Sequence, residues 1–156
     1  MGHDLLSRIL AVQAAYARCL DDGDLSHWPA FFEERCTYKI TTADNHRHGL
    51  EAGLVFANSR AMLVDRVTSL REANVYERHA YRHFLGQPSI QSHDDTQAAS
   101  ETPFFVLRIM RDGTTEVFAS GRYLDRYSLA GDTPRLIERI VVCDSSRFDT
   151  LLAIPL

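Results

Sequence analysis

The chain has 156 residues, of which 45% are hydrophobic and 24% are charged, and its net charge is -4. This length and composition predict one globular domain spanning residues 1–156, with enough apolar residues to bury a core without disulfides. Because the chain has neither a Lys/Arg block nor an apolar run of about 18 residues, we expect no nucleic-acid partner and no membrane partner.

The first ten residues and the cysteines indicate the compartment. Asp4 and Arg8 interrupt any apolar run at the amino-terminal end, so we expect no signal peptide there. Cys19, Cys36 and Cys143 are widely spaced and odd in number. We interpret them as reduced, buried side chains of a cytoplasmic protein.

The front of the chain has helical spacing. Residues 4–21 carry apolar side chains at steps of three and four, which predicts a helix with one buried stripe, capped by Asp4. Gly23 suits the left-handed turn that ends such a helix. Asp24 is then placed to cap a short second helix that carries Trp28.

A strand, a loop and a third helix are expected next. Residues 35–43 alternate and are rich in Thr, Tyr and Ile, which predicts a strand. The polar stretch 44–49 indicates a loop. Residues 58–73 return to helical spacing, with Asn58 as the predicted cap.

After residue 75 the pattern is that of strands. Turn signals occur at 93–95, 111–113 and 130–132, and apolar, β-branched or aromatic runs lie between and beyond them. Helices first and strands afterwards predict an α+β fold, with the helices packed on one face of a curled, mainly antiparallel sheet.

The segment NVYERHAYRHFLG, residues 74–86, holds three polar side chains that could carry chemistry: Glu77, His79 and His83. In a helix the two histidines would lie about 6 Å apart along the axis and could share a metal. In a strand they would share a face but lie about 13 Å apart, too far to converge readily on one ion. A metal site, a catalytic histidine and a hydrogen-bonded polar face are all compatible with local propensity.

Other polar clusters have plainer interpretations. Asp21, Asp22 and Asp24 form a carboxylate cluster that the end of a helix explains, and His46 and His48 lie in the predicted loop. Nucleotide-binding glycine motifs, the nucleophile motif G-x-S-x-G and the Cys/His patterns of iron–sulfur proteins are absent from the sequence.

Several segments together resemble one known family. They are YARCLDDGDLSHWPAFFEERCTYKIT, DNHRHGL, SRAMLVDRVTSLREANVYERHAYRHFLG, TPFFVLRIMRDGTTEVFASGRYLD and CDSSRFDTLLAIPL. Over essentially its whole length the chain resembles the small (beta) subunits of aromatic-ring-hydroxylating dioxygenases. The resemblance implies the cone-shaped α+β roll shared by ketosteroid isomerase, scytalone dehydratase and nuclear transport factor 2. It also implies that RHAYRH begins a long bent strand.

The resemblance implies a structural role within an oxygenase. In that family a Rieske [2Fe-2S] cluster and a mononuclear Fe(II) belong to the large (alpha) subunit, so this chain would hold no catalytic, cofactor or metal residue. Three large and three small subunits would form an α3β3 hexamer that receives electrons from NADH through a reductase. The expected reaction is the cis-dihydroxylation of an aromatic carboxylate, with terephthalate as the candidate.

Two segments are predicted to contact other subunits. Family likeness favours packing of the apolar tail LLAIPL between subunits, and the alternative is that it covers the core of its own domain. The polar strand would offer arginine forks and aromatic rings, which are enriched in interfaces. The candidate contact residues are Tyr76, Arg78, His79, Arg82, His83, Leu151, Leu152, Ile154 and Leu156.

Two alternatives remain open. A free-standing dehydratase or isomerase of the same roll would place Asp, His and Tyr in a pocket between sheet and helices. Asp21 or Asp22, His79 and Tyr38 could take those roles. A small-ligand-binding or scaffold member of the same superfamily is the third possibility.

Overall fold

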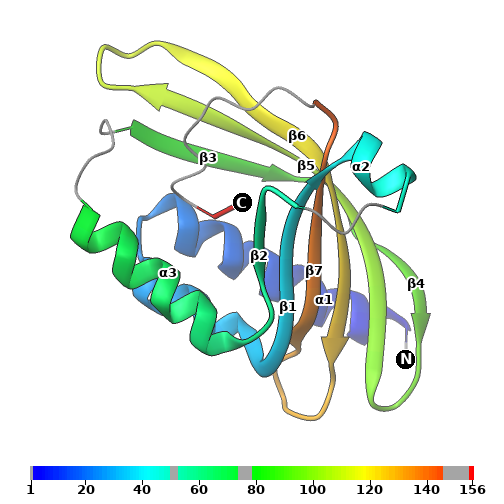
Figure 1. Ribbon diagram of the computed structural model, residues 1–156. Helices are drawn as coiled ribbons and strands as arrows, with labels where there is room; N and C mark the ends of the chain where they lie inside the picture. The colour runs from blue at the N-terminus through cyan, green and yellow to red at the C-terminus, as the bar shows by residue number, and fades with distance from the viewer. Residues whose placement is uncertain (1, 50–52, 74–78, 146–154) are drawn as a thin grey trace.

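The computed structural model in Figure 1 describes residues 2–49, 53–73, 79–145 and 155–156. Helices α1 (Gly2–Asp21) and α3 (Arg60–Ala73) lie on the same side of one curved sheet. Residue 156 lies between these helices and the sheet, inside the roll. The predicted order of helices first and strands afterwards is confirmed.

The sheet is mixed and open, with the strand order β2-β1-β7-β6-β5-β3, and β4 also pairs with β5. The β1 and β7 strands run parallel, and every other described pairing is antiparallel. The strand bounds are β1 Phe32–Thr42, β2 Val55–Ala57, β3 His79–Leu85, β4 Ser89–His93, β5 Gln97–Met110, β6 Thr115–Ser128 and β7 Arg135–Cys143.

The helix predictions are confirmed, with changes at the caps. The first helix begins at Gly2, so Asp4 lies within its first turn, and Gly23 adopts the predicted left-handed conformation with φ 73°. Trp28 lies in the short 3-10 helix η1 (Leu25–Phe31). Asp24 precedes that helix without a capping hydrogen bond, because its carboxylate accepts from Ser26 and His27 instead.

Two local predictions were wrong. The predicted polar loop begins with a short helix, α2 (Ala43–Arg47), because the Thr42 hydroxyl accepts from the backbone N–H of Asn45 and caps it. The cap of α3 is Ser59 rather than Asn58, since the Ser59 hydroxyl accepts from the backbone N–H of Met62. Neighbouring polar residues are equally plausible caps in a sequence.

The three turn signals all fall between paired strands. In the β4–β5 turn the Asp94 carboxylate accepts from the backbone N–H groups of Thr96 and Gln97. In the β5–β6 turn Asp112 accepts from the backbone N–H of Thr114, and Gly113 has φ 90°. These local bonds fix the register of the hairpins.

The segment with the two histidines is a strand where it is described. Residues 79–85 pair with β5, from His79 opposite Met110 to Leu85 opposite Phe104. The helical alternative is therefore excluded for these residues. Tyr76 and Arg78 lie outside the described residues.

The core lies between the helices and the inner face of the sheet. It combines the predicted stripe of α1 with aromatic side chains from η1, β1, β5 and β6. All three cysteines are free and buried, as predicted, and burial raises the pKa of the Cys19 thiol to about 11. Among the described residues, no helix is long and apolar enough to cross a membrane.

Candidate functional site

The interior of the roll contains a fully buried ion pair. Arg139 on β7 lies opposite Asp125 on β6, and its Nε and Nη2 donate to the two carboxylate oxygens of Asp125 at 2.8 Å each. Burial by itself lowers the pKa of Arg139. The Asp125 carboxylate outweighs that effect and holds the pKa well above its ordinary value, so the guanidinium stays charged.

Aromatic rings and an amide surround this ion pair. The guanidinium carbon of Arg139 lies 4.3 Å from the ring centre of Tyr16 and 3.9 Å from that of Tyr123, an arrangement that favours a desolvated cation. Gln13 of α1 donates to the Thr102 hydroxyl at 2.9 Å. It thereby ties the first helix to the polar interior.

Leu156 occupies the same interior. Its backbone oxygen accepts from the hydroxyls of Tyr16 and Tyr38 at 2.9 Å each, and its N–H donates to the Tyr38 hydroxyl at 3.0 Å. Its side chain is 1% exposed. The ring of Tyr38 lies edge-on to Trp28, with the ring centres 5.1 Å apart, and burial raises the pKa of Tyr38 well above its ordinary value.

A second polar cluster joins the end of α1 to the edge strand β3. The Asp21 carboxylate accepts from the backbone N–H of His83 at 3.0 Å and from its ring Nδ1 at 2.7 Å. Arg82 approaches the same carboxylate at 4.0 Å. Free backbone N–H groups at the edge of a sheet can pair with a strand of another molecule. The Asp21 carboxylate binds one such group, the N–H of His83.

The predicted polar face of β3 is divided by the pleat of the strand. Side chains of neighbouring residues point to opposite faces, so His83 is buried against Asp21 while the side chain of Arg82 is 62% exposed. Only Arg82 of this pair therefore stays available to another subunit. His79 opens the strand, and its side chain is outside the described part.

The structure also changes the interpretation of the tail LLAIPL, which was predicted to contact other subunits. Leu156 lies in the core of its own chain. For this residue the structure therefore agrees with the alternative that the tail covers its own domain. Leu156 is not available to a partner in this structure. A buried oxygen needs donors, and the two tyrosine hydroxyls supply them. Leu151, Leu152 and Ile154 lie outside the described residues.

Two of the groups proposed for a free-standing enzyme, Asp21 and Tyr38, have other partners in the structure. Asp21 is paired with His83, and Asp22 is exposed, whereas the side chain of His79 lies outside the described part of the chain. The Tyr38 hydroxyl is bonded to Leu156. Within the described ranges no group of three His, Cys, Asp or Glu side chains could hold a metal ion.

Sequence reasoning missed an apolar patch on the outer face of the sheet. Phe84 of β3 and Phe105 of β5 are cross-strand neighbours whose rings stack with centres 4.8 Å apart, and they are 44% and 41% exposed. Val117 of β6, opposite Leu107, is 64% exposed. We call Phe84, Phe105, Leu107 and Val117 the outer-face patch. Strand alternation could have placed Phe84 beside Arg82 on this face.

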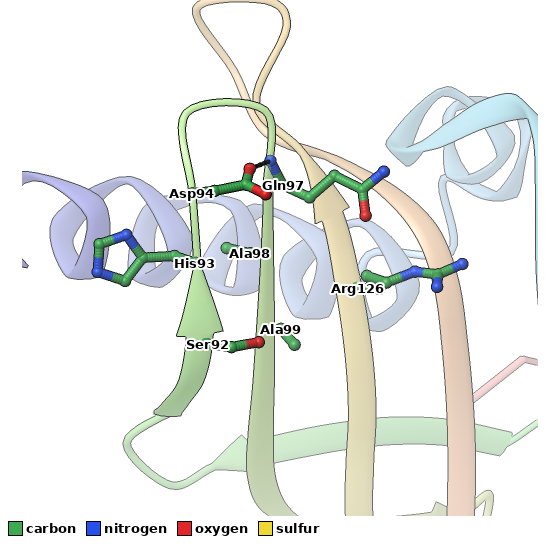
Figure 2. A pocket seen from close by; sticks show the side chains of 7 residues that line it. All are labelled: Ser92, His93, Asp94, Gln97, Ala98, Ala99 and Arg126. Carbon is green, nitrogen blue, oxygen red and sulfur yellow. Dashed lines mark hydrogen bonds between the residues drawn. The ribbon is translucent and has the colours of Figure 1, made fainter.

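The pockets near the β4–β5 turn are surface features. One of them, with a volume of about 170 Å³, lies between the turn and Arg126 of β6. Figure 2 shows that the His93 side chain points away from Arg126. Most of the side chains that line this pocket, including Ser92 and Gln97, are exposed. It places no group of candidate catalytic residues together.

Comparison with known proteins identifies similar chains over nearly the whole length. Residues 15–150 match the family model described as ring hydroxylating beta subunit. The beta 1 subunit of the terminal oxygenase component of terephthalate 1,2-dioxygenase from Comamonas sp is 57% identical over 149 residues, covering 96% of this chain and 97% of that protein. The anthranilate 1,2-dioxygenase small subunit from Burkholderia cepacia is 37% identical over 148 residues, covering 95% and 92%.

Solved structures show the same fold. The crystal structure of a proposed beta subunit of an aromatic-ring-hydroxylating dioxygenase from Novosphingobium aromaticivorans DSM 12444 superposes with a TM-score of 0.92 at 37% identity, covering 99% of both chains. A proposed scytalone dehydratase from the same organism has a TM-score of 0.72 at 14% identity, covering 98% of this chain and 93% of that one. The second likeness shows the fold alone, and the predicted roll is confirmed.

The buried ion pair generates a stability prediction. Replacing Arg139 with Met leaves the Asp125 carboxylate buried without its partner, so we expect the free energy of unfolding to fall by about 3–5 kcal/mol. The matched control is Arg122→Met, which breaks the more exposed pair with Glu101 and should cost at most about 1 kcal/mol. Urea unfolding followed by circular dichroism measures both, and equal losses would contradict this account.

The contact between α1 and β3 generates another prediction. Asp21→Asn weakens the bonds to the backbone N–H and ring of His83, and we expect a loss of about 1.5–3 kcal/mol in unfolding free energy. Hydrogen exchange at the His83 amide should accelerate. Asp22→Asn changes an exposed neighbour and should stay within about 0.5 kcal/mol of the parent. An unchanged exchange rate in Asp21→Asn would show that the carboxylate does not protect this edge.

Proposed function

This chain belongs to the family of ring-hydroxylating dioxygenase beta subunits, and from that premise we propose that it is the structural small subunit of an oxygenase that cis-dihydroxylates terephthalate or a closely related aromatic carboxylate. The substrate follows the terephthalate 1,2-dioxygenase subunit that is 57% identical to it.

One observation carries the structural role: the buried arginine and two buried tyrosines of the interior are bonded to other groups of the chain. Arg139 is held by Asp125, and Tyr16 and Tyr38 are held by Leu156. A substrate would have to displace these contacts to reach them. The described interior therefore supports a packed scaffold rather than a reaction chamber.

The proposal assigns the redox chemistry to a large (alpha) subunit. A mononuclear oxygenase iron uses His and carboxylate ligands and receives electrons from a Rieske [2Fe-2S] cluster. Among its described residues this chain gathers no three such side chains. The proposed complex is an α3β3 hexamer with contacts between large and small subunits and among small subunits, which a reductase supplies with electrons from NADH. The free thiols suit the cytoplasm as its location.

We propose that the outer-face patch, together with Arg82, contacts a neighbouring subunit. Arg82 and Phe84 are two residues apart on β3, so they point to the same face. Stacked aromatic rings beside an exposed arginine have the composition of an interface centre, since both residue types are enriched there. Burying the rings of Phe84 and Phe105 in an interface would provide the favourable free energy that they do not gain while exposed to water.

One observation fits the alternative function, that of a free-standing dehydratase or isomerase. His83 is oriented by a carboxylate, and its buried Nε2 has no hydrogen-bond partner, as in a general base. However, the His83 side chain is completely buried, so a substrate has no described route to Nε2. Dehydration or isomerisation by the purified chain, abolished in Asp21→Asn, would favour this alternative.

Reconstitution tests the proposed function. We expect the chain alone to convert no aromatic carboxylate. With its large subunit, the reductase, NADH and O₂ it should yield a cis-dihydrodiol of terephthalate, detected by liquid chromatography and mass spectrometry. Omitting the small subunit should abolish or strongly reduce product formation, because the large subunit then lacks its scaffold. Full activity of the large subunit without this chain would contradict the proposal.

A paired substitution tests the contact surface. Phe84→Ser combined with Phe105→Ser removes the stacked rings, and we expect the affinity for the mixed complex to fall at least about tenfold, since central aromatic anchors each contribute about 2 kcal/mol or more. The control is Phe56→Ser, which removes a 54% exposed ring from β2 outside the patch. Size-exclusion chromatography measures assembly, and circular dichroism checks the fold. Equal assembly of both variants would exclude the patch.

A further inference from the structure

Two peptide bonds of the chain join an aspartate to a glycine, Asp22–Gly23 after α1 and Asp112–Gly113 between β5 and β6. In such a pair the glycine nitrogen can attack the side-chain carboxyl carbon of the aspartate, because glycine has no Cβ atom to hinder the approach. The amide hydrogen and the carboxyl hydroxyl leave as one water molecule, and a five-membered imide forms. Water then opens the imide at the main-chain carbonyl and leaves isoaspartate, in which the backbone runs through the side chain.

The two pairs have the same backbone arrangement. Both glycines have a positive φ, 73° at Gly23 and 90° at Gly113. Each donates its N–H to the carbonyl oxygen three residues earlier, Gly23 to Leu20 at 3.1 Å and Gly113 to Met110 at 2.9 Å. Both pairs are exposed, and open space surrounds the position that a Cβ atom would take on either glycine. The backbone therefore does not distinguish the two pairs.

The carboxylates of the two aspartates differ. Oδ1 of Asp112 accepts from the backbone N–H of Thr114 at 2.8 Å, and the hydrogen bonds from Thr114 hold the pKa of Asp112 below its ordinary value. Both effects oppose imide formation, since this bond must break before the carboxyl group can turn to the glycine and since only the neutral acid loses its hydroxyl readily. The Asp22 carboxylate is exposed, and among the described residues no group donates a hydrogen bond to it.

We propose that Asp22 is a site of spontaneous isoaspartate formation, and that Thr114 protects Asp112 from the same reaction. Ring closure releases one water molecule and ring opening takes one up, so the reaction requires no enzyme, metal or oxidant. The product carries a free α-carboxylate at residue 22, which is the group that isoaspartate-specific methyltransferases methylate.

Isomerisation at Asp22 changes the end of α1. The backbone N–H of Asp24 donates to the carbonyl oxygen of Cys19 at 3.0 Å, and the N–H of Gly23 donates to that of Leu20. Both bonds connect atoms on opposite sides of the Asp22–Gly23 peptide bond and close the helix with the left-handed glycine. Isoaspartate lengthens the backbone by one atom at this point, so the two bonds cannot keep their present geometry.

The change at the helix end reaches the edge strand β3. Asp21, the residue before the altered one, accepts from the backbone N–H of His83 at 3.0 Å and from its ring Nδ1 at 2.7 Å. A displaced helix end moves this carboxylate away from the strand. Isomerisation at Asp22 should therefore expose the His83 amide to exchange with solvent.

Ageing of the purified chain tests the proposal. After several weeks at neutral pH and physiological temperature, peptide mapping by mass spectrometry locates isoaspartate, and methylation by an isoaspartate-specific methyltransferase counts it. We expect isoaspartate to accumulate about tenfold or more faster at Asp22 than at Asp112, because a hydrogen bond to an ionised carboxylate must first break at Asp112. Equal or faster accumulation at Asp112, or none at Asp22, would overturn the proposal.

Two controls separate the effect of the fold from that of the neighbouring sequence. In urea, where Thr114 no longer protects Asp112, the two rates should converge, and a difference that persists there would contradict protection by the fold. Asp22→Glu keeps the charge, but its imide would be six-membered and forms far more slowly, so this variant should accumulate isoaspartate at neither position over the same period. Circular dichroism checks that this variant is folded.

Hydrogen exchange tests the link to β3. In the aged parent chain, exchange at the His83 amide should accelerate in the fraction of molecules that carry isoaspartate, whereas the aged Asp22→Glu chain should exchange like fresh protein. Unchanged exchange in the isomerised fraction would show that the helix end and β3 are not coupled in this way. These measurements need no large subunit, so their outcome is independent of the assignment as an oxygenase subunit.

Discussion

The charge of Arg139 constrains the rest of the interior. A guanidinium without water requires a carboxylate, and Asp125 supplies it from the directly opposite position on the neighbouring strand. The sandwich of Tyr16 and Tyr123 then stabilises the faces of the guanidinium. Because Tyr16 belongs to α1 and Arg139 to β7, the guanidinium connects the first helix to the sheet.

Leu156 closes the same interior from another direction. Its contacts connect α1 through Tyr16 with β1 through Tyr38, so three parts of the chain that are distant in sequence meet at one oxygen atom. The curved sheet is open, with β2 and β3 at its two ends. The contacts of Leu156 connect α1 with β1 inside this open roll. The proposed contact with a neighbouring subunit lies on the outer face instead, where the stacked rings of Phe84 and Phe105 are partly exposed.

The edge strand β3 shows why an Asp–His pair is weak evidence for catalysis. Asp21 and His83 have the geometry of an oriented base, yet the same carboxylate accepts from the backbone N–H of His83. An edge strand needs such protection whether or not any reaction takes place. The charge on Asp21 therefore has a structural explanation in the position of β3 at the end of the sheet.

The sequence by itself determined the local elements and the family. The apolar stripe of 4–21, the left-handed Gly23 and the three turn signals depend on neighbouring residues, and local patterns encode them directly. Only the tertiary structure decided that Asp21 pairs with His83, that Arg82 and His83 point to opposite faces, and that Leu156 lies in its own core. Partners 62 residues apart, as Asp21 and His83 are, or 118, as Tyr38 and Leu156 are, leave no periodic signal in the chain. Their pairing depends on which face of each strand the whole fold buries.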